Sequence, residues 1–281
     1  MRIARHLRDG RPALAVVTDD AVVSLECDHT DLPSLLEACG GDLAAAVDAM
    51  ERGPAMPLDE ARLLSPVGRP PTILAVGLNY RAHAAEGGRE PPTVPIIFNK
   101  HHHCIVGPHH PIHIPAAAPD MVDYEGELAI VIGRSARAVS ASKALAHIAG
   151  YTIMNDVSVR DWQRASPTMM MGKSWDTHGP CGPWLVTGDS LDPHACRLVT
   201  EVNGAVRQDA NTDDLIFNCY EIVEHLSTAF TLEAGTVIAT GTPEGVGAFS
   251  KPPAFLSPGD VVSVTVEGIG TLTNPVTAEP V

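Results

Sequence analysis

The alternation of apolar and polar positions at the start of the chain predicts three short strands followed by two helices. Apolar runs at residues 3–7, 13–17 and 21–23 are separated by turn signals at residues 8–10 and 19–20. We therefore expect a small antiparallel sheet here. Farther along, Asp31 lies ahead of Pro33 as an N-cap with proline in the first turn. Asp42 begins a second, Ala-rich helix that ends near Gly53.

A proline-rich segment at residues 65–71 predicts a domain boundary. Its prolines and glycine disfavour a helix and are typical of a stiff linker. We expect a small N-terminal α/β domain over residues 1–65 and a larger domain over residues 66–281.

The larger domain is expected to consist mainly of strands. Residues 72–76 predict a buried strand that leads to a short helix at residues 77–87, and apolar and polar residues alternate over residues 262–267. Helical spacing recurs at residues 140–149 and 215–232. Because strands predominate over few and mostly short helices, the pattern favours a β-rich α+β fold. One face of the last predicted helix carries Ile222, Val223, Leu226 and Phe230.

Three carboxylates are the most informative candidates for chemistry. Glu125 and Glu127 stand where a strongly apolar run begins, and a strand would direct both side chains to the same face. A third acid, Asp156, follows another apolar run at residues 150–155. Such an oxygen-rich set suits Mg²⁺, Mn²⁺ or Ca²⁺ better than zinc. The alternative is a solvated strand edge, where acidic residues keep a sheet soluble.

Two lysines are candidates for stabilising negative charge. Lys173 follows three methionines, so it is either a snorkelling side chain or an ammonium group that stabilises an oxyanion or a substrate carboxylate. Lys100, at the end of the run Ile-Ile-Phe-Asn-Lys, is a second candidate of the same kind.

Two further pairs have the spacing of one helical turn. His83 and Glu86 can hold a water, with the imidazole taking its proton, or they form a simple surface pair. Arg160 and Gln163 can align a carboxylate, although Arg160 can equally pair with an acid for structural reasons.

The glycine-rich and histidine-rich segments give weaker signals. Residues 241–247 follow a strand-like run and can cradle an anion through backbone N–H groups. They lack the Gly-Lys-Ser/Thr ending of a P-loop, and no Rossmann fingerprint is present, so we expect no nucleotide cofactor. The histidines at residues 101–103 match no zinc-finger spacing and are expected to form a polar active-site rim or a plain loop.

Charge and composition limit the partners. The 281 residues are 44% hydrophobic and carry a formal net charge of −15, which disfavours nucleic acids and anionic membranes. The six cysteines are scattered without a C-x-x-C pair, as in reduced intracellular proteins. Neither a signal peptide nor an 18-residue apolar span is visible, so we expect a cytoplasmic protein.

Six motifs follow one another along about three quarters of the chain. They are GLNYRAHAAE at 77–86, FNK at 98–100, DYEGELAIVIG at 123–133, NDVSVRDWQ at 155–163, GKSWDTHGP at 172–180 and GTPEGVG at 241–247. In this order they resemble the fumarylacetoacetate hydrolase family. The resemblance implies a mixed β-roll catalytic domain and a homodimer. It also implies a divalent metal site at Glu125, Glu127 and Asp156.

The same resemblance gives the remaining site residues their roles. His83 and Glu86 become a water-activating dyad on a mobile segment, and Lys173 stabilises charge. Substrate contacts are expected from residues of the matching motifs, namely Tyr80, Lys100, Arg160, Gln163, Gly241 and Thr242. The histidines at residues 101–103 replace the small residues of many family members and leave the substrate open.

Family members act on small anionic 2-oxo and β-diketo acids. We expect the chain to be a metal-dependent hydrolase that cleaves a C–C bond in a β-diketo acid such as an acylpyruvate. Water activated by His83 would attack the distal carbonyl, and the ion would stabilise the enolate that leaves. An oxaloacetate-type decarboxylase, or a 2-oxo acid isomerase, hydratase or lyase, forms the same enolate and stays open. A binding protein without activity is a further alternative.

Overall fold

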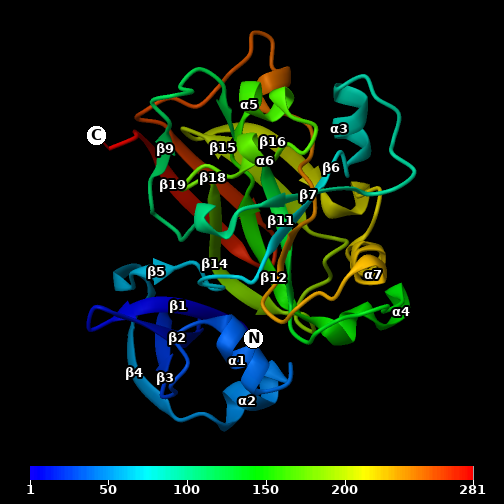
Figure 1. Cartoon of the computed structure of the whole chain (residues 1–281). Coiled ribbons are helices and arrows are strands. Elements are labelled where there is room, and N and C mark those ends of the chain that lie inside the picture. The colour runs from blue at the N-terminus through cyan, green and yellow to red at the C-terminus, as the bar shows by residue number, and fades with distance from the viewer. Residues whose placement is uncertain (281) are drawn as a thin grey trace.

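A computed structural model describes residues 1–280 of the chain. Figure 1 shows the N-terminal strands and helices, in blue, at one end of the molecule and the larger part of the β-structure beyond them. Strands outnumber helices, and the sheets contain antiparallel and parallel pairs. The expected β-rich α+β fold with a mixed β-roll is confirmed.

The largest of the three sheets formed by the described residues has 12 strands. Its neighbours pair antiparallel except for β6 with β17 and β8 with β14. Outside the main path, β5 (Leu63–Leu64) pairs with β1 and β8 (Ile105–Val106) pairs with β14. The order along the path is β4 (Arg52–Pro57), β3 (Ala21–Leu25), β2 (Arg11–Val17), β1 (Arg2–Arg8), β14 (Gly179–Thr187), β12 (Ile148–Asn155), β11 (Gly126–Ile132), β17 (Val237–Ala239), β6 (Ile73–Gly77) and β7 (Ile96–Lys100).

Two smaller sheets complete the β-structure. A two-stranded sheet joins β10 (Val122–Asp123) to β13 (Ser158–Val159). A five-stranded sheet follows the order β16 (Ala205–Asn211), β15 (Arg197–Val202), β18 (Val261–Val266), β19 (Gly270–Ala278) and β9 (Ile112–Ile114). Every second side chain of β15, β18 and β19 is buried, as the sequence pattern predicts for β18.

The N-terminal helices begin where the sequence predicts. The Asp31 carboxylate accepts from the Ser34 N–H at the start of α1 (Leu32–Ala38), and Asp42 caps α2 (Leu43–Ala49) in the same way. The end predicted for the second helix, near Gly53, is wrong. The chain leaves the helix after Ala49 because β4 takes up backbone pairing with β3 from Arg52 onward.

Backbone pairing continues across the expected domain boundary. β1 pairs with β14 of the larger part, so the N-terminal strands extend the same sheet. One buried apolar cluster includes Leu35 and Leu36 of α1 together with Ala129 and Val131 of β11. The N-terminal part therefore packs directly on the central sheet, and the division at residue 65 stays a prediction.

Two predicted helices are shorter than expected. Over residues 140–149 the chain forms only α4 (Ala141–Ala144) and a 3₁₀ turn (Leu145–His147), because β12 begins at Ile148. Over residues 215–232 the helix is α7 (Cys219–Ala229), which begins with a capping box at Asn218. Phe230 lies beyond its end and is 43% exposed, whereas Ile222, Val223 and Leu226 are buried as predicted.

The predicted helix at residues 77–87 is α3 (Arg81–Glu86), and the strand before it is β6. Two further short helices, α5 (Arg160–Ala165) and α6 (Met170–Lys173), follow β13. Among the described residues, no helix is long and apolar enough to cross a membrane.

Candidate active site

The three predicted metal-binding carboxylates converge where β11 begins and β12 ends. These strands pair antiparallel with Gly126 opposite Asn155, so the residues just outside them, Glu125 and Asp156, lie side by side. The Asp156 N–H donates to the Glu125 carbonyl at 2.8 Å. Glu127 lies two residues along the strand, and ligand atoms of all three carboxylates lie within 4.8 Å of one another. All three residues are buried, which excludes a solvated strand edge.

Two buried lysines lie against these acids. Lys173, at the end of α6, places its Nζ 2.6 Å from both Glu125 Oε2 and Asp156 Oδ2. Lys100, at the end of β7, places its Nζ 2.7 Å from Asp156 Oδ1 and donates to the Lys173 carbonyl. Neither lysine snorkels to solvent, because both are almost fully buried.

Arg160 connects the acid cluster to a residue that the sequence analysis did not select. Its guanidinium lies 2.5 Å from Glu125 Oε1 and 2.8 Å from Asp123 Oδ2, and it donates to Gln163 Oε1 at 3.0 Å. Asp123 is fully buried and also accepts from the N–H groups of Gly247 and Ala248. It therefore positions both Arg160 and the loop that follows residue 246. The one sequence signal for it was its place at the head of the DYEGE run.

The charges of the cluster fit a divalent cation. Burial, Asp156 and Glu125 raise the pKa of Glu127 well above its usual value. Burial acts in the same direction on Glu125, but Lys173 and Arg160 outweigh it and lower the pKa of that carboxyl. A cation among the carboxylates would offset the repulsion that Glu127 experiences. The three acids thus have both the chemistry and the spacing of an oxygen-ligand site for Mg²⁺, Mn²⁺ or Ca²⁺.

His83 and Glu86 form the predicted pair on α3. His83 Nδ1 lies 3.1 Å from Glu86 Oε2, and Glu86 Oε1 accepts from the Gly245 N–H at 3.0 Å. Because a carboxylate only accepts hydrogen bonds, the neutral imidazole carries its proton on Nδ1 and keeps a lone pair on Nε2. Glu86 therefore fixes both the orientation and the tautomer of His83.

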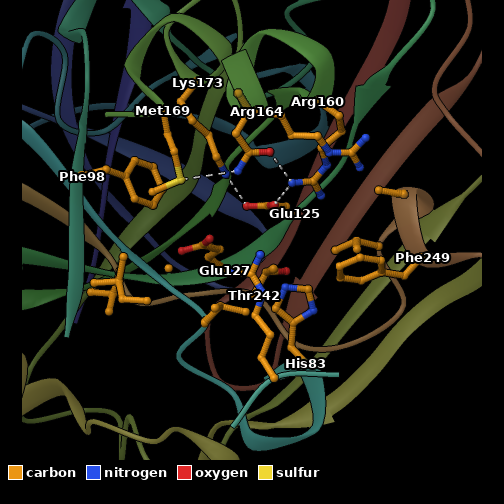
Figure 2. Close-up of a pocket in the computed structure, with 18 residues that line it drawn as sticks. His83, Phe98, Glu125, Glu127, Arg160, Arg164, Met169, Lys173, Thr242 and Phe249 are labelled. Carbon is orange, nitrogen blue, oxygen red and sulfur yellow. Dashed lines mark hydrogen bonds and ion pairs between the residues drawn. The ribbon is translucent and has the colours of Figure 1, made fainter. Parts of the chain in front are cut away.

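A cavity of about 440 Å³ brings these groups together. Figure 2 shows Lys173, Arg160 and Arg164 along one side, His83 and Thr242 on the other, and Glu125 and Glu127 between them. The predicted residues that line it are His83, Glu125, Glu127, Arg160, Gln163, Lys173 and Thr242.

The other predicted residues do not line the cavity. Lys100 and Asp156 are buried and contact each other, and Asp156 also contacts Lys173. Glu86 is exposed and contacts His83. Gly241 donates its N–H to Glu127 Oε2 at 2.7 Å and so supports a ligand instead of facing the cavity. Tyr80 is fully buried, and its hydroxyl has no hydrogen-bond partner within residues 1–280.

The lining of the cavity differs from the sequence prediction in two ways. Arg89 and Arg164 line the cavity, together with apolar side chains from several segments. The histidines at residues 101–103 do not line it, so an active-site rim is wrong for them. The rings of His101 and His102 stack, the ring of His103 lies edge-on to both, and His102 Nε2 lies 2.8 Å from Arg69 Nη2. The apolar wall consists of Val76, Leu78, Ile96, Phe98, Met169, Val246, Ala248 and Phe249.

Comparisons with known proteins identify the family of the chain. The model of the fumarylacetoacetate (FAA) hydrolase C-terminal family matches residues 72–277. The chain is 44% identical to oxaloacetate tautomerase FAHD2A, mitochondrial, of Bos taurus, over 97% of this chain and 89% of that protein.

Solved structures give the same result. A fumarylacetoacetate hydrolase from Exiguobacterium antarcticum is 38% identical with a TM-score of 0.88, over 99% of this chain and 100% of that chain. A 5-carboxymethyl-2-hydroxymuconate delta-isomerase from Mycobacterium smegmatis is 41% identical with a TM-score of 0.82, over the same shares of both chains. The chain is therefore a member of the fumarylacetoacetate hydrolase family of enzymes.

Proposed function

We propose that the chain interconverts the keto and enol forms of a small 2-oxo acid such as oxaloacetate, with a divalent ion at Glu125, Glu127 and Asp156. One observation carries the proposal: His83, oriented by Glu86, lines the same cavity as Glu125, Glu127 and Lys173. The names of the tautomerase and isomerase relatives support it. The isomerase alternative of the sequence analysis thereby takes precedence over the hydrolase.

The acid cluster and its lysine receive the 2-oxo acid end of the substrate. When bound there, the ion supplies Lewis-acid polarisation of the 2-oxo group. Burial opposes the charged form of Lys173, but Asp156 and Glu125 outweigh burial and raise its pKa, so the ammonium group persists. Lys173 therefore offers positive charge to the oxygen on which the enolate charge develops.

His83 performs the proton transfer. The lone pair on its Nε2 takes a proton from C3 of the bound acid, and the carboxylate of Glu86 stabilises the resulting imidazolium. Return of the proton to the 2-oxo oxygen gives the enol, and return to C3 regenerates the keto acid. The apolar side chains around the site limit the access of water to the enolate.

Hydrolysis of a β-diketo acid is the second candidate. The same His83 can deprotonate a water in place of a carbon acid, and the cavity of about 440 Å³ leaves room for a longer substrate. A decarboxylase acting on oxaloacetate would also form the enolate, but it would not need His83 as a base.

One experiment separates these reactions. Oxaloacetate and an acylpyruvate are incubated in D₂O with Mg²⁺ or Mn²⁺, with and without chelator, and followed by NMR. Tautomerisation exchanges the C3 protons without forming pyruvate, whereas decarboxylation and hydrolysis release pyruvate. We expect ion-dependent exchange that His83→Gln lowers at least 100-fold and that the exposed control His225→Gln leaves unchanged. If His83→Gln exchanged the C3 protons as fast as the wild type, His83 would not be the base of the reaction.

We also propose a homodimer, as the family resemblance implies, and its mass in solution by light scattering tests this. The cytoplasmic location stays a prediction, and the bovine relative carries the word mitochondrial in its name.

A further inference from the structure

The cavity contains more positive charge than its own acids require. Four cationic side chains line it, namely Arg89, Arg160, Arg164 and Lys173, but only two carboxylates do, those of Glu125 and Glu127. This excess stands out in a chain with a net charge of −15. A positively charged cavity in an acidic protein concentrates anions at that place.

Two of the four cations are already engaged inside the protein. Arg160 and Lys173 are buried and lie 2.5 Å and 2.6 Å from the Glu125 carboxylate. Arg89 and Arg164, in contrast, form no ion pair within residues 1–280, and both are exposed where they line the cavity. Their charges are therefore available to a ligand at the solvent side.

The two arginines come from different segments. Arg164 lies on α5, directly after Gln163, and Arg89 follows α3, where its N–H donates to the Ala84 carbonyl at 2.8 Å. The same two helices carry Arg160 and His83, which face the reaction site. A ligand held by Arg89 and Arg164 is thus oriented by the segments that carry the reacting groups.

We propose that Arg89 and Arg164 bind the second carboxylate of a dicarboxylic substrate. This inference rests on the proposed function, in which the first carboxylate and the 2-oxo group lie at Glu125, Glu127 and Lys173. The rest of the lining is largely apolar, with Phe98, Met169 and Phe249 among its members, and Arg89 and Arg164 are the lining arginines without an ion pair in the described part of the chain. Guanidinium groups match a carboxylate with two parallel hydrogen bonds.

The kinetic test compares two four-carbon acids that differ only in the second carboxylate, oxaloacetate and 2-oxobutyrate. The readout is deuterium exchange at C3. In the double variant Arg89→Met/Arg164→Met, we expect kcat/KM for oxaloacetate to fall about 10- to 100-fold and that for 2-oxobutyrate to stay within about twofold. The single variant Arg164→Lys should keep part of the preference for oxaloacetate over 2-oxobutyrate. The exposed control Arg11→Met should leave kcat/KM for both acids unchanged.

A binding test is independent of turnover. Calorimetry on the Mg²⁺-loaded protein compares malate with 2-hydroxybutyrate, neither of which can enolise at a 2-oxo group. We expect the wild type to bind malate at least tenfold more tightly and the double variant to lose this difference. Equal binding of the two acids by the wild type, or an unchanged preference in the double variant, overturns the inference. A wild type that prefers malate but shows no exchange at C3 of oxaloacetate would instead refute only the proposed reaction.

Discussion

Replacing Glu127 by glutamine should have opposite effects on the ion-free and the ion-loaded protein. Burial and the neighbouring Asp156 and Glu125 raise the pKa of Glu127 well above its usual value, so folding without the ion favours the protonated form of this carboxyl. The unfolded chain releases that proton above about pH 4.3. Stability of the ion-free wild type therefore falls as the pH rises from that value toward the raised pKa. A glutamine side chain at this position would keep an acceptor for the Gly241 N–H, and it would remove the fall in stability with rising pH because it does not titrate.

With the ion bound, the wild type should be more stable than Glu127→Gln. At a concentration 100 times the Kd, a ligand adds about 2.7 kcal/mol to the free energy of unfolding. At roughly 2 °C per kcal/mol for a chain of this size, the melting temperature rises by about 5 °C. If the substitution weakens binding 100-fold, the same ion concentration adds only about 0.4 kcal/mol.

The assay is thermal unfolding at neutral pH after chelation, without ion and with Mg²⁺ or Mn²⁺, for the wild type, Glu127→Gln and the exposed control Glu37→Gln. We expect Glu127→Gln to melt no lower than the ion-free wild type and to show almost no rise with ion. The control should follow the wild type. Equal rises in the wild type and Glu127→Gln, or no rise in either, would refute the assignment of a metal site at Glu127.

Three further substitutions test the surroundings of the site. Asp123→Asn removes the charge that faces Arg160 inside the protein, and we expect urea unfolding to show a loss of about 3 kcal/mol; an unchanged midpoint would contradict the positioning role. Glu86→Gln keeps a hydrogen-bond acceptor for His83 but not the charge that stabilises an imidazolium, so exchange at C3 should slow at least tenfold while the melting temperature stays the same. Tyr80→Phe removes a buried hydroxyl without a partner, so activity should be unchanged and stability equal or up to about 1 kcal/mol higher; a lower kcat/KM would restore Tyr80 as a substrate contact.

Local patterns in the sequence were sufficient for most of the elements. Alternating or continuous apolar runs located the strands, and side-chain caps at Asp31 and Asp42 located the starts of two helices, because both signals act within a few residues. Helix ends were less well predicted. At residues 49–53 and 148–149 the chain leaves the helix to pair with a strand distant in sequence, and local propensity does not contain that pairing.

The sequence by itself also identified the candidate metal ligands Glu125 and Glu127, which share a strand spacing, and the motifs that point to one family. Only the tertiary structure decided which groups meet. Antiparallel pairing of β11 with β12 brings Asp156 to Glu125, and Asp123 reaches Arg160 through a contact between residues 37 positions apart. The cavity, with Arg89 and Arg164 at its edge, is formed by segments whose approach depends on the packing of the whole sheet, and no local pattern records that approach.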